Sequence, residues 1–141
     1  MSISLKGDKK ISNIPATKSK ALRINLNTDI YGTFAEIGAG QETARNFFRA
    51  GGASGTIAKA MSAYDKDFSD AIYGIEEDKR YVTEDRLKRM LHHEVDLIED
   101  RLSRKKHPDK LFFSYANTVA TIDFSKKFKG HGWVGLRFQL D

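Results

Sequence analysis

The sequence predicts a mixed α/β fold in which a sheet of few strands packs with several helices. Three observations predict it. Apolar and polar residues alternate at 22–26, a long apolar stripe at helical spacing runs from Glu84 to Lys106, and two later apolar segments, 111–116 and 133–140, have the composition of strands. Because strands occur both before and after the helices, a layered α/β arrangement is favoured over a helical bundle.

The chain of 141 residues suits one domain, and its positive charge is concentrated at the start. Residues 1–20 carry five lysines against Asp8 alone, which gives 5 − 1 = +4 of the formal net charge of +5. A polar, lysine-rich stretch of this kind predicts a disordered basic arm over 1–20, followed by a single α/β domain over 21–141.

The first half of this domain predicts one strand and several helices. The alternation at 22–26 predicts the first strand. Helices are predicted over Gln41–Ala50 and Asp65–Tyr73, because each of these segments is closed by a glycine. The segment 56–63 is compatible with a strand or a helix, and its alanines favour the helix.

The longest predicted helix runs from Glu84 to about Lys106. Thr83 is a suitable N-cap, acidic residues occupy the first turn, and basic residues occupy the last turn, so both ends suit the helix dipole. Its stripe is formed by apolar residues at helical spacing: Leu87, Met90, Leu91, Val95, Ile98 and Leu102.

Two further strands are expected over 111–116 and 133–140. In the second strand, four alternate residues share one face that we expect to be buried: Val134, Leu136, Phe138 and Leu140. The sequence ends one residue later, which is unusual for a core strand. We therefore expect an incomplete domain, the N-terminal portion of a longer protein.

Composition excludes several function classes. The absence of cysteine removes disulfide scaffolds, thiol catalysis and cysteine-ligated metal centres. No apolar run reaches the roughly 18 residues that a membrane-spanning helix needs, and no secretory signal follows Met1, so we expect a cytoplasmic protein. The sequence does not favour nucleic-acid binding, because the net charge lies in the arm and no arginine–aromatic pattern accompanies it.

The glycine-rich segment 38–56 is the main candidate for ligand binding. Glycines before a helix free main-chain amides that attract anions. We expect main-chain amides near Gly38, Gly40 and Gly55 to bind the anion. The hydroxyls of Ser54 and Thr56 would donate further hydrogen bonds to it. Arg45 and Lys59 would neutralise its charge. The dinucleotide fingerprint fails at Thr43 and the P-loop pattern fails at Thr56. A helix C-cap with a close-packing loop is the alternative.

Metal binding has weaker support. Glu36 or Asp65 could hold Mg²⁺ beside a bound phosphate, although carboxylates at such positions are more often helix caps. His92-His93-Glu94 lacks the four-residue histidine spacing of zinc proteases, which favours an exposed helix face. No catalytic residue is identified.

Several segments resemble an uncharacterised bacterial family. They are Ala21–Leu26, Tyr31–Glu42, Asn46–Lys59, Met61–Asp65 and His131–Gly135. Members of this family often carry the label nicotinate-nucleotide adenylyltransferase or TonB-dependent receptor, and they are several times longer than this chain. The first label implies nucleotidyltransferase activity, for which a histidine–any–glycine–histidine motif would follow the first strand. Here no histidine occurs between Leu26 and His92, so this motif is missing.

These observations lead to two hypotheses. The first is a protein that binds a nucleotide or phosphorylated metabolite at 38–56, with adenylyltransferase-like activity implied only by the family resemblance. The second is a non-enzymatic interaction or scaffold module that packs on the remainder of a parent chain or forms a homo-oligomer.

Overall fold

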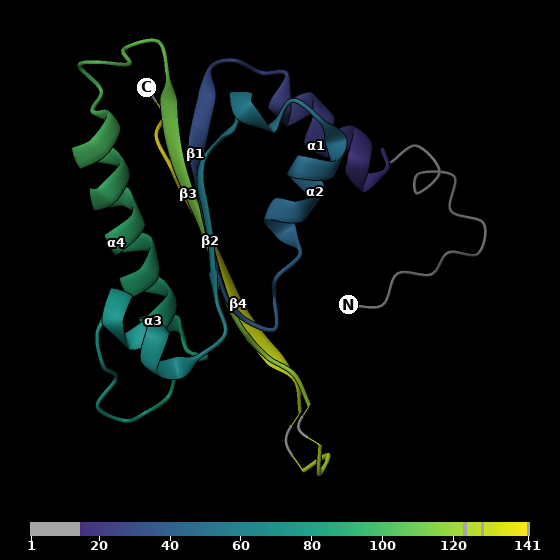
Figure 1. Cartoon of the computed structure of the whole chain (residues 1–141), viewed down its shortest axis with the longest axis vertical. Coiled ribbons are helices and arrows are strands. Elements are labelled where there is room, and N and C mark those ends of the chain that lie inside the picture. Colours follow the sequence, from purple (N-terminus) through teal and green to yellow (C-terminus); the bar gives the residue numbers. More distant parts are fainter. Residues whose placement is uncertain (1–14, 123, 128, 141) are drawn as a thin grey trace.

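The computed structural model describes residues 15–122, 124–127 and 129–140. Its centre is a four-stranded mixed sheet in the order β2-β1-β3-β4 (Figure 1). The strands are β1 (Ile30–Gly38), β2 (Ile57–Ala63), β3 (Leu111–Ala120) and β4 (His131–Phe138). β1 pairs in parallel with both β2 and β3, whereas β4 is antiparallel to β3. The expected mixed α/β fold with few strands and several helices is confirmed.

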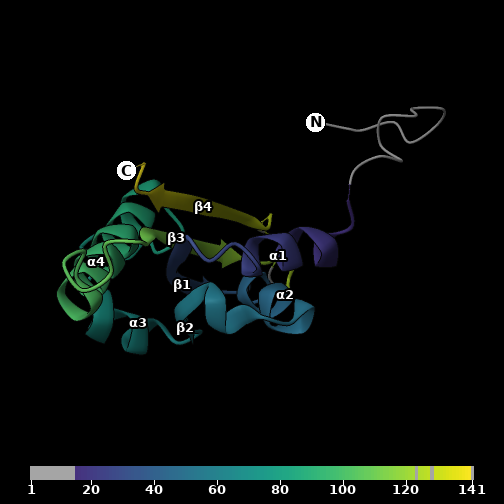
Figure 2. The same ribbon diagram turned by 90° about the horizontal axis from the view of Figure 1, so that it is seen from above.

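Helices lie on both sides of this sheet (Figure 2). On one side are α1 (Thr17–Asn25) and α2 (Thr43–Ala50), followed by a 3-10 turn, η2 (Ala53–Gly55). On the other side are α3 (Lys66–Tyr73) and α4 (Glu84–Leu102). The connection from β1 to β2 therefore uses one face, and the connection from β2 to β3 uses the opposite face.

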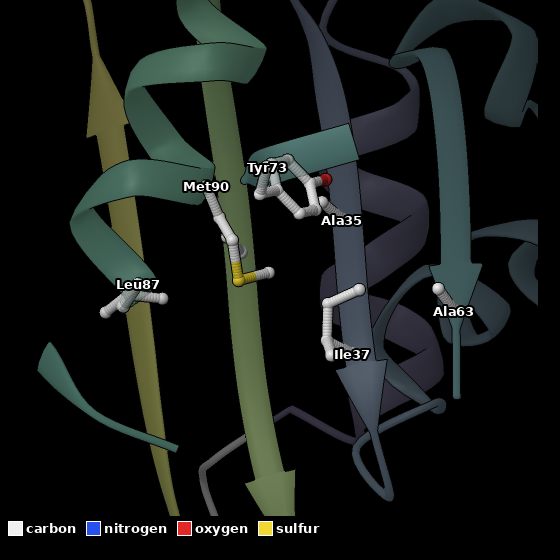
Figure 3. Packing of buried hydrophobic residues seen from close by; sticks show 7 residues of the cluster. Ala35, Ile37, Ala63, Tyr73, Leu87 and Met90 are labelled. Atoms are coloured by element: carbon white, nitrogen blue, oxygen red, sulfur yellow. The ribbon is translucent and has the colours of Figure 1, made fainter. Parts of the chain in front are cut away.

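The main hydrophobic core lies between the sheet and α4 (Figure 3). Met90 of α4 is completely buried against two strand alanines, Ala35 and Ala116, which have no exposed surface either. Small residues on the sheet let the helix approach closely, so the long side chains of α4 fill the space between the layers. On the opposite face, Phe34 of β1 packs on Phe47 of α2, with 5.1 Å between ring centroids.

Three predicted helices are present with small changes at their ends. α4 begins after Thr83, whose hydroxyl accepts a hydrogen bond from the Arg86 amide, and it ends four residues earlier than expected. α3 begins after Asp65, which caps the Phe68 amide at 2.8 Å. α2 occupies the C-terminal eight residues of the segment predicted for it.

Two predictions for the first half of the domain are wrong. The segment 22–26 belongs to α1 and its C-cap, where Ala21 and Asn25 are buried one helical turn apart. The first strand is instead β1, which is buried on both faces and therefore lacks polar alternation. The segment expected to be helical at 56–63 is β2, because parallel pairing with β1 outweighs the helix preference of its alanines.

The ends of the chain also differ from expectation. The proposed arm lies outside the described residues up to position 14, and Thr17 to Lys20 form the first turn of α1. The face of β4 that was expected to be buried is exposed, since Val134, Leu136 and Phe138 show 64%, 57% and 59% of their surface. Leu140, beyond the strand, is also exposed.

Candidate functional site

The carboxyl ends of β1 and β3 form a natural crevice. The chain leaves β1 toward the α2 face, and it arrives at β3 from the α4 face, so the two strands mark the position at which the connections change sides. Open α/β sheets bind their ligands at such a position. We call this cavity of about 360 Å³ the strand-end crevice; it is lined by residues 37–39, 64–66, 118–121, Ser69, Tyr81 and Val82.

Lys66 provides positive charge at the strand-end crevice. It is the first residue of α3, and its ammonium lies 4.8 Å from the centre of the Tyr81 ring, which is a cation–π distance. Thr118 and Ser69 are buried at the base, whereas Asp65 and Lys66 are exposed at the mouth. The crevice thus combines apolar walls with a few polar groups, as small-molecule sites do.

Arg86, on α4, connects helix α3 to the loop that follows α3. Its side chain is completely buried. The guanidinium donates to the Gly74 carbonyl at 2.6 Å, to Ser69 Oγ at 2.8 Å, to Glu76 Oε1 at 3.2 Å and to Asp70 Oδ1 at 3.4 Å. Two carboxylates compensate its charge, so a cation can be kept away from water at this position.

The same cluster fixes Tyr81 at the crevice. The Arg86 guanidinium lies 4.9 Å from the Tyr81 ring centre. The phenol donates to Asp70 Oδ2 at 2.9 Å, and the Tyr81 carbonyl accepts from Thr118 Oγ1 at 2.7 Å. Desolvation and the hydrogen bond to Asp70 raise the pKa of Tyr81, which favours the protonated phenol that donates this bond. Contacts with Arg86, Asp70 and Thr118 therefore fix Tyr81 in the crevice wall.

The first glycine cluster of the segment 38–56, formed by Gly38 and Gly40, lies beside the crevice, but part of the hydrogen-bonding capacity of this loop is used internally. The Ala39 amide donates to the Val119 carbonyl at 3.0 Å. Glu36, which is 4% exposed, accepts from the Thr43 amide at 2.8 Å and from Asn117 Nδ2 at 3.3 Å. The Glu36 carboxylate thus supplies the negative charge that the N-terminus of α2 favours.

Gly40 is required by close packing at this loop. A Cβ atom there would lie 2.7 Å from Val119 Cγ2 and 2.9 Å from Asn117 Oδ1. The Asn117 amide also donates to the Gly40 carbonyl at 2.9 Å, which draws the loop onto β3. Gly38 has a φ of 78°, a backbone conformation that favours glycine, and it lines the strand-end crevice.

The second glycine cluster of the segment 38–56, formed by Gly51, Gly52 and Gly55, lies at the other end of the sheet. Ser54 and Gly55 belong to η2, and Thr56 directly precedes β2. The register pairs Gly32 with Ile57 and Ile37 with Ala63, so the two clusters are separated by about the length of a strand, roughly 20 Å. Thr56 is completely buried. The structure therefore does not bring Ser54, Gly55 and Thr56 together with Gly38 and Gly40.

Lys59 lies beside α4, and its side chain is partly exposed. Its ammonium forms an ion pair with Glu94, whose side chain has no exposed surface. Tyr73 donates to Glu94 Oε1 at 2.7 Å. Burial, and then the charge of Glu94, raise the pKa of Tyr73 well above its ordinary value of 10.0. The positive charge of Lys59 is thus already matched inside the protein.

Arg45 lines a separate, open hollow of about 510 Å³ on the α2 face, together with Glu36 and Arg49. It pairs with Glu42 at 3.4 Å. The two histidines of α4 have different surroundings: His92 pairs with the exposed Asp96, whereas His93 packs on Tyr73. Among the described residues, no group of three or more potential metal ligands comes together. Magnesium binding by Glu36 or Asp65 stays a prediction.

Of the residues that build the crevice, sequence reasoning named Gly38 and Asp65 and missed the others. Lys66, Ser69, Tyr81 and Thr118 belong to no recognisable motif. Arg86 did leave a signal, because Arg86, Met90, Glu94 and Ile98 are spaced by four residues and all are buried. Two charged residues on this buried stripe of α4 indicate internal partners for both.

Comparison with known proteins places the chain by fold only. No protein-family model and no curated protein matches it. The solved structure of the competence/damage inducible protein CihA from Agrobacterium tumefaciens is similar, with a TM-score of 0.58 and 14% sequence identity over 89% of this chain and 81% of that chain. At this identity, the similarity shows a shared α/β fold. It supports neither label of the bacterial family that the sequence resembles. None of the described helices is long and apolar enough to cross a membrane.

Proposed function

We propose that the protein binds a small anionic ligand, a nucleotide or a phosphorylated metabolite, in the strand-end crevice. The observation that carries this proposal is a cavity of about 360 Å³ at the carboxyl ends of β1 and β3, with a lysine at its mouth. The similar fold of CihA is consistent with a ligand-binding α/β domain.

Each part of the crevice has a role in this proposal. Lys66 contacts the negative charge of the ligand, and Gly38, whose missing Cβ lets it pack on the Val119 carbonyl of β3, lines the crevice beside it. Asp65 lies at the same mouth and is the carboxylate that would hold Mg²⁺ beside a phosphate. Arg45 and Lys59, which were expected to neutralise the ligand, face other surfaces of the protein.

Isothermal titration calorimetry tests this proposal with ATP, nicotinate mononucleotide and inorganic phosphate, each with and without MgCl₂. We expect saturable binding of at least one of them. Lys66→Ala should weaken that binding about tenfold, or about 1.4 kcal/mol, through the loss of one charge contact. Lys105→Ala, an exposed lysine beyond α4, is the matched control and should bind as the unmodified protein does. Absence of heat with all three compounds would remove the proposal.

A different observation favours a second function, a non-enzymatic interaction module. Large apolar side chains are exposed along β4, and they adjoin an apolar groove. Exposed apolar surface of this kind commonly marks a contact with another protein.

A further inference from the structure

The sheet is covered unequally on its two faces. A Cβ atom on Gly135 would contact Leu87 and Leu91 of α4, so this residue of β4 faces α4. Because side chains alternate along a strand, Val134 and Leu136 point to the opposite face. There they are exposed at 64% and 57%, although both are large apolar residues. α4 thus covers β4 on one face, and the other face is left open.

This open face continues into a groove. The groove has a volume of about 440 Å³, and its walls are formed almost wholly by apolar side chains. Phe113 and Tyr115 of β3 form its floor. Ile24 of α1 and Phe47 of α2 form one wall, and Leu136 and Phe138 of β4 form the other. We call this surface, with Val134, the β3–β4 face. None of these seven residues is charged, so the surface is mainly apolar.

The dimensions of the β3–β4 face suit one α-helix. Two neighbouring strands are about 10 Å wide, which equals the diameter of a helix with its side chains. On the opposite side of the sheet, the single helix α4 contacts both β3 and β4. β4 has eight residues, or about 27 Å of strand, which a helix of about 18 residues would match in length.

The charge beside the groove indicates what kind of helix fits. α1 forms one wall through Ile24, and it carries Lys18, Lys20 and Arg23 without any acidic residue. Lys20 precedes Ile24 by four residues and therefore lies on the same side of α1. Two acidic residues, Asp29 and Asp109, belong to the loops before β1 and β3 and are close in sequence to Ile30 and Leu111 of the groove, whereas α1 itself carries only basic charge. A partner with acidic flanks would thus meet opposite charge along α1.

We infer that the β3–β4 face binds an acidic amphipathic helix supplied by a partner protein. This inference specifies the partner for the interaction function proposed above, and it is independent of ligand binding in the strand-end crevice. The apolar side of the helix would cover Val134, Leu136 and Phe138, and its acidic flank would lie beside Lys20 and Arg23.

Binding of synthetic peptides to the full chain tests this inference. One peptide of about 18 residues has a leucine face with glutamate flanks, and a second has the same face with lysine flanks. Fluorescence anisotropy should give about tenfold tighter binding of the acidic peptide. The double variant Lys20→Glu, Arg23→Glu should reverse this preference. Equal affinity for both peptides would contradict the charge argument and overturn the inference.

Two variants separate the β3–β4 face from general stickiness. Leu136→Asp should weaken binding of the acidic peptide at least about tenfold. Phe68→Asp is the matched control, because Phe68 is similarly exposed, at 60%, but lies on α3; its affinity should be unchanged. Circular dichroism verifies that both variants are folded.

Sedimentation velocity distinguishes this partner from a second copy of the chain. We expect a monomer without peptide. A dimer that Leu136→Asp dissociates would overturn the helix as the occupant, while the interaction function itself would survive. A monomer that binds neither peptide would contradict both the inference and the interaction function.

Discussion

Arg86 shows, at the scale of one residue, how a buried charge can position the wall of a candidate site. Its side chain has no exposed surface, and it bonds both to Ser69 of α3 and to Gly74 at the start of the segment between α3 and α4. A cation in this position is stable only while Asp70 and Glu76 remain paired with it. The crevice depends on this residue although Arg86 does not line it, because Tyr81 packs against its guanidinium.

Replacement of Arg86 by methionine should therefore destabilise the protein strongly. Methionine has a similar length, but it would remove the buried cation that both Asp70 and Glu76 face and would take the donor away from the Gly74 carbonyl. We expect a loss of about 3–5 kcal/mol in the free energy of unfolding, measured by urea denaturation. Arg101→Met, on an exposed part of the same helix, should change it by less than about 0.5 kcal/mol. Similar values for both variants would contradict the role given to Arg86.

At the scale of secondary-structure elements, local signals predicted the helices better than the strands. Thr83 and the apolar stripe specify α4 within the chain itself. β1 and β2 form because they pair with each other in parallel, and this contact is not visible in either segment alone. The five-residue alternation at 22–26 was too short to distinguish a strand from a helix with a buried side. Most of the site was missed for a related reason, since its residues come from β1, α3, the loop before α4 and β3, and they converge only in the folded protein.

Glu94 joins three elements, and its contacts predict a dependence of stability on pH. It accepts from Tyr73 of α3 and pairs with Lys59 of β2 while belonging to α4 itself. The folded state raises the pKa of Tyr73 above the 10.0 expected for the unfolded chain. The stabilisation is therefore fully present below pH 10 and decreases as the pH rises above that value, because only the unfolded chain ionises there.

Urea denaturation between pH 8 and about pH 11 measures this effect. Tyr73→Phe should be less stable than the unmodified protein at pH 8 by about 1–3 kcal/mol, because Glu94 loses a donor. Its stability should then fall less steeply above pH 10. Tyr64→Phe, at a residue that is 79% exposed, should follow the unmodified protein. Equal slopes for Tyr73→Phe and the unmodified protein would show that Tyr73 titrates normally.

At the scale of the whole molecule, the two proposals concern different parts of one sheet. The strand-end crevice lies where the connections change faces, at the carboxyl ends of β1 and β3. The β3–β4 face lies at the side of the sheet where β4 is the edge strand. The fold class followed from the sequence because composition and periodicity report on layers. The position of the crevice required the strand order, which depends on contacts between distant segments.

Chemical-shift mapping on the ¹⁵N-labelled protein tests the central claim most directly. ATP with MgCl₂ is titrated into the protein, and the amide shifts are followed residue by residue. We expect the largest saturable changes at Gly38, Lys66 and Thr118, and none beyond noise around η2 or Arg45. Saturable changes centred on Ser54 to Thr56 or on Arg45, or no saturable changes with this or the other anions, would contradict the crevice as the ligand site.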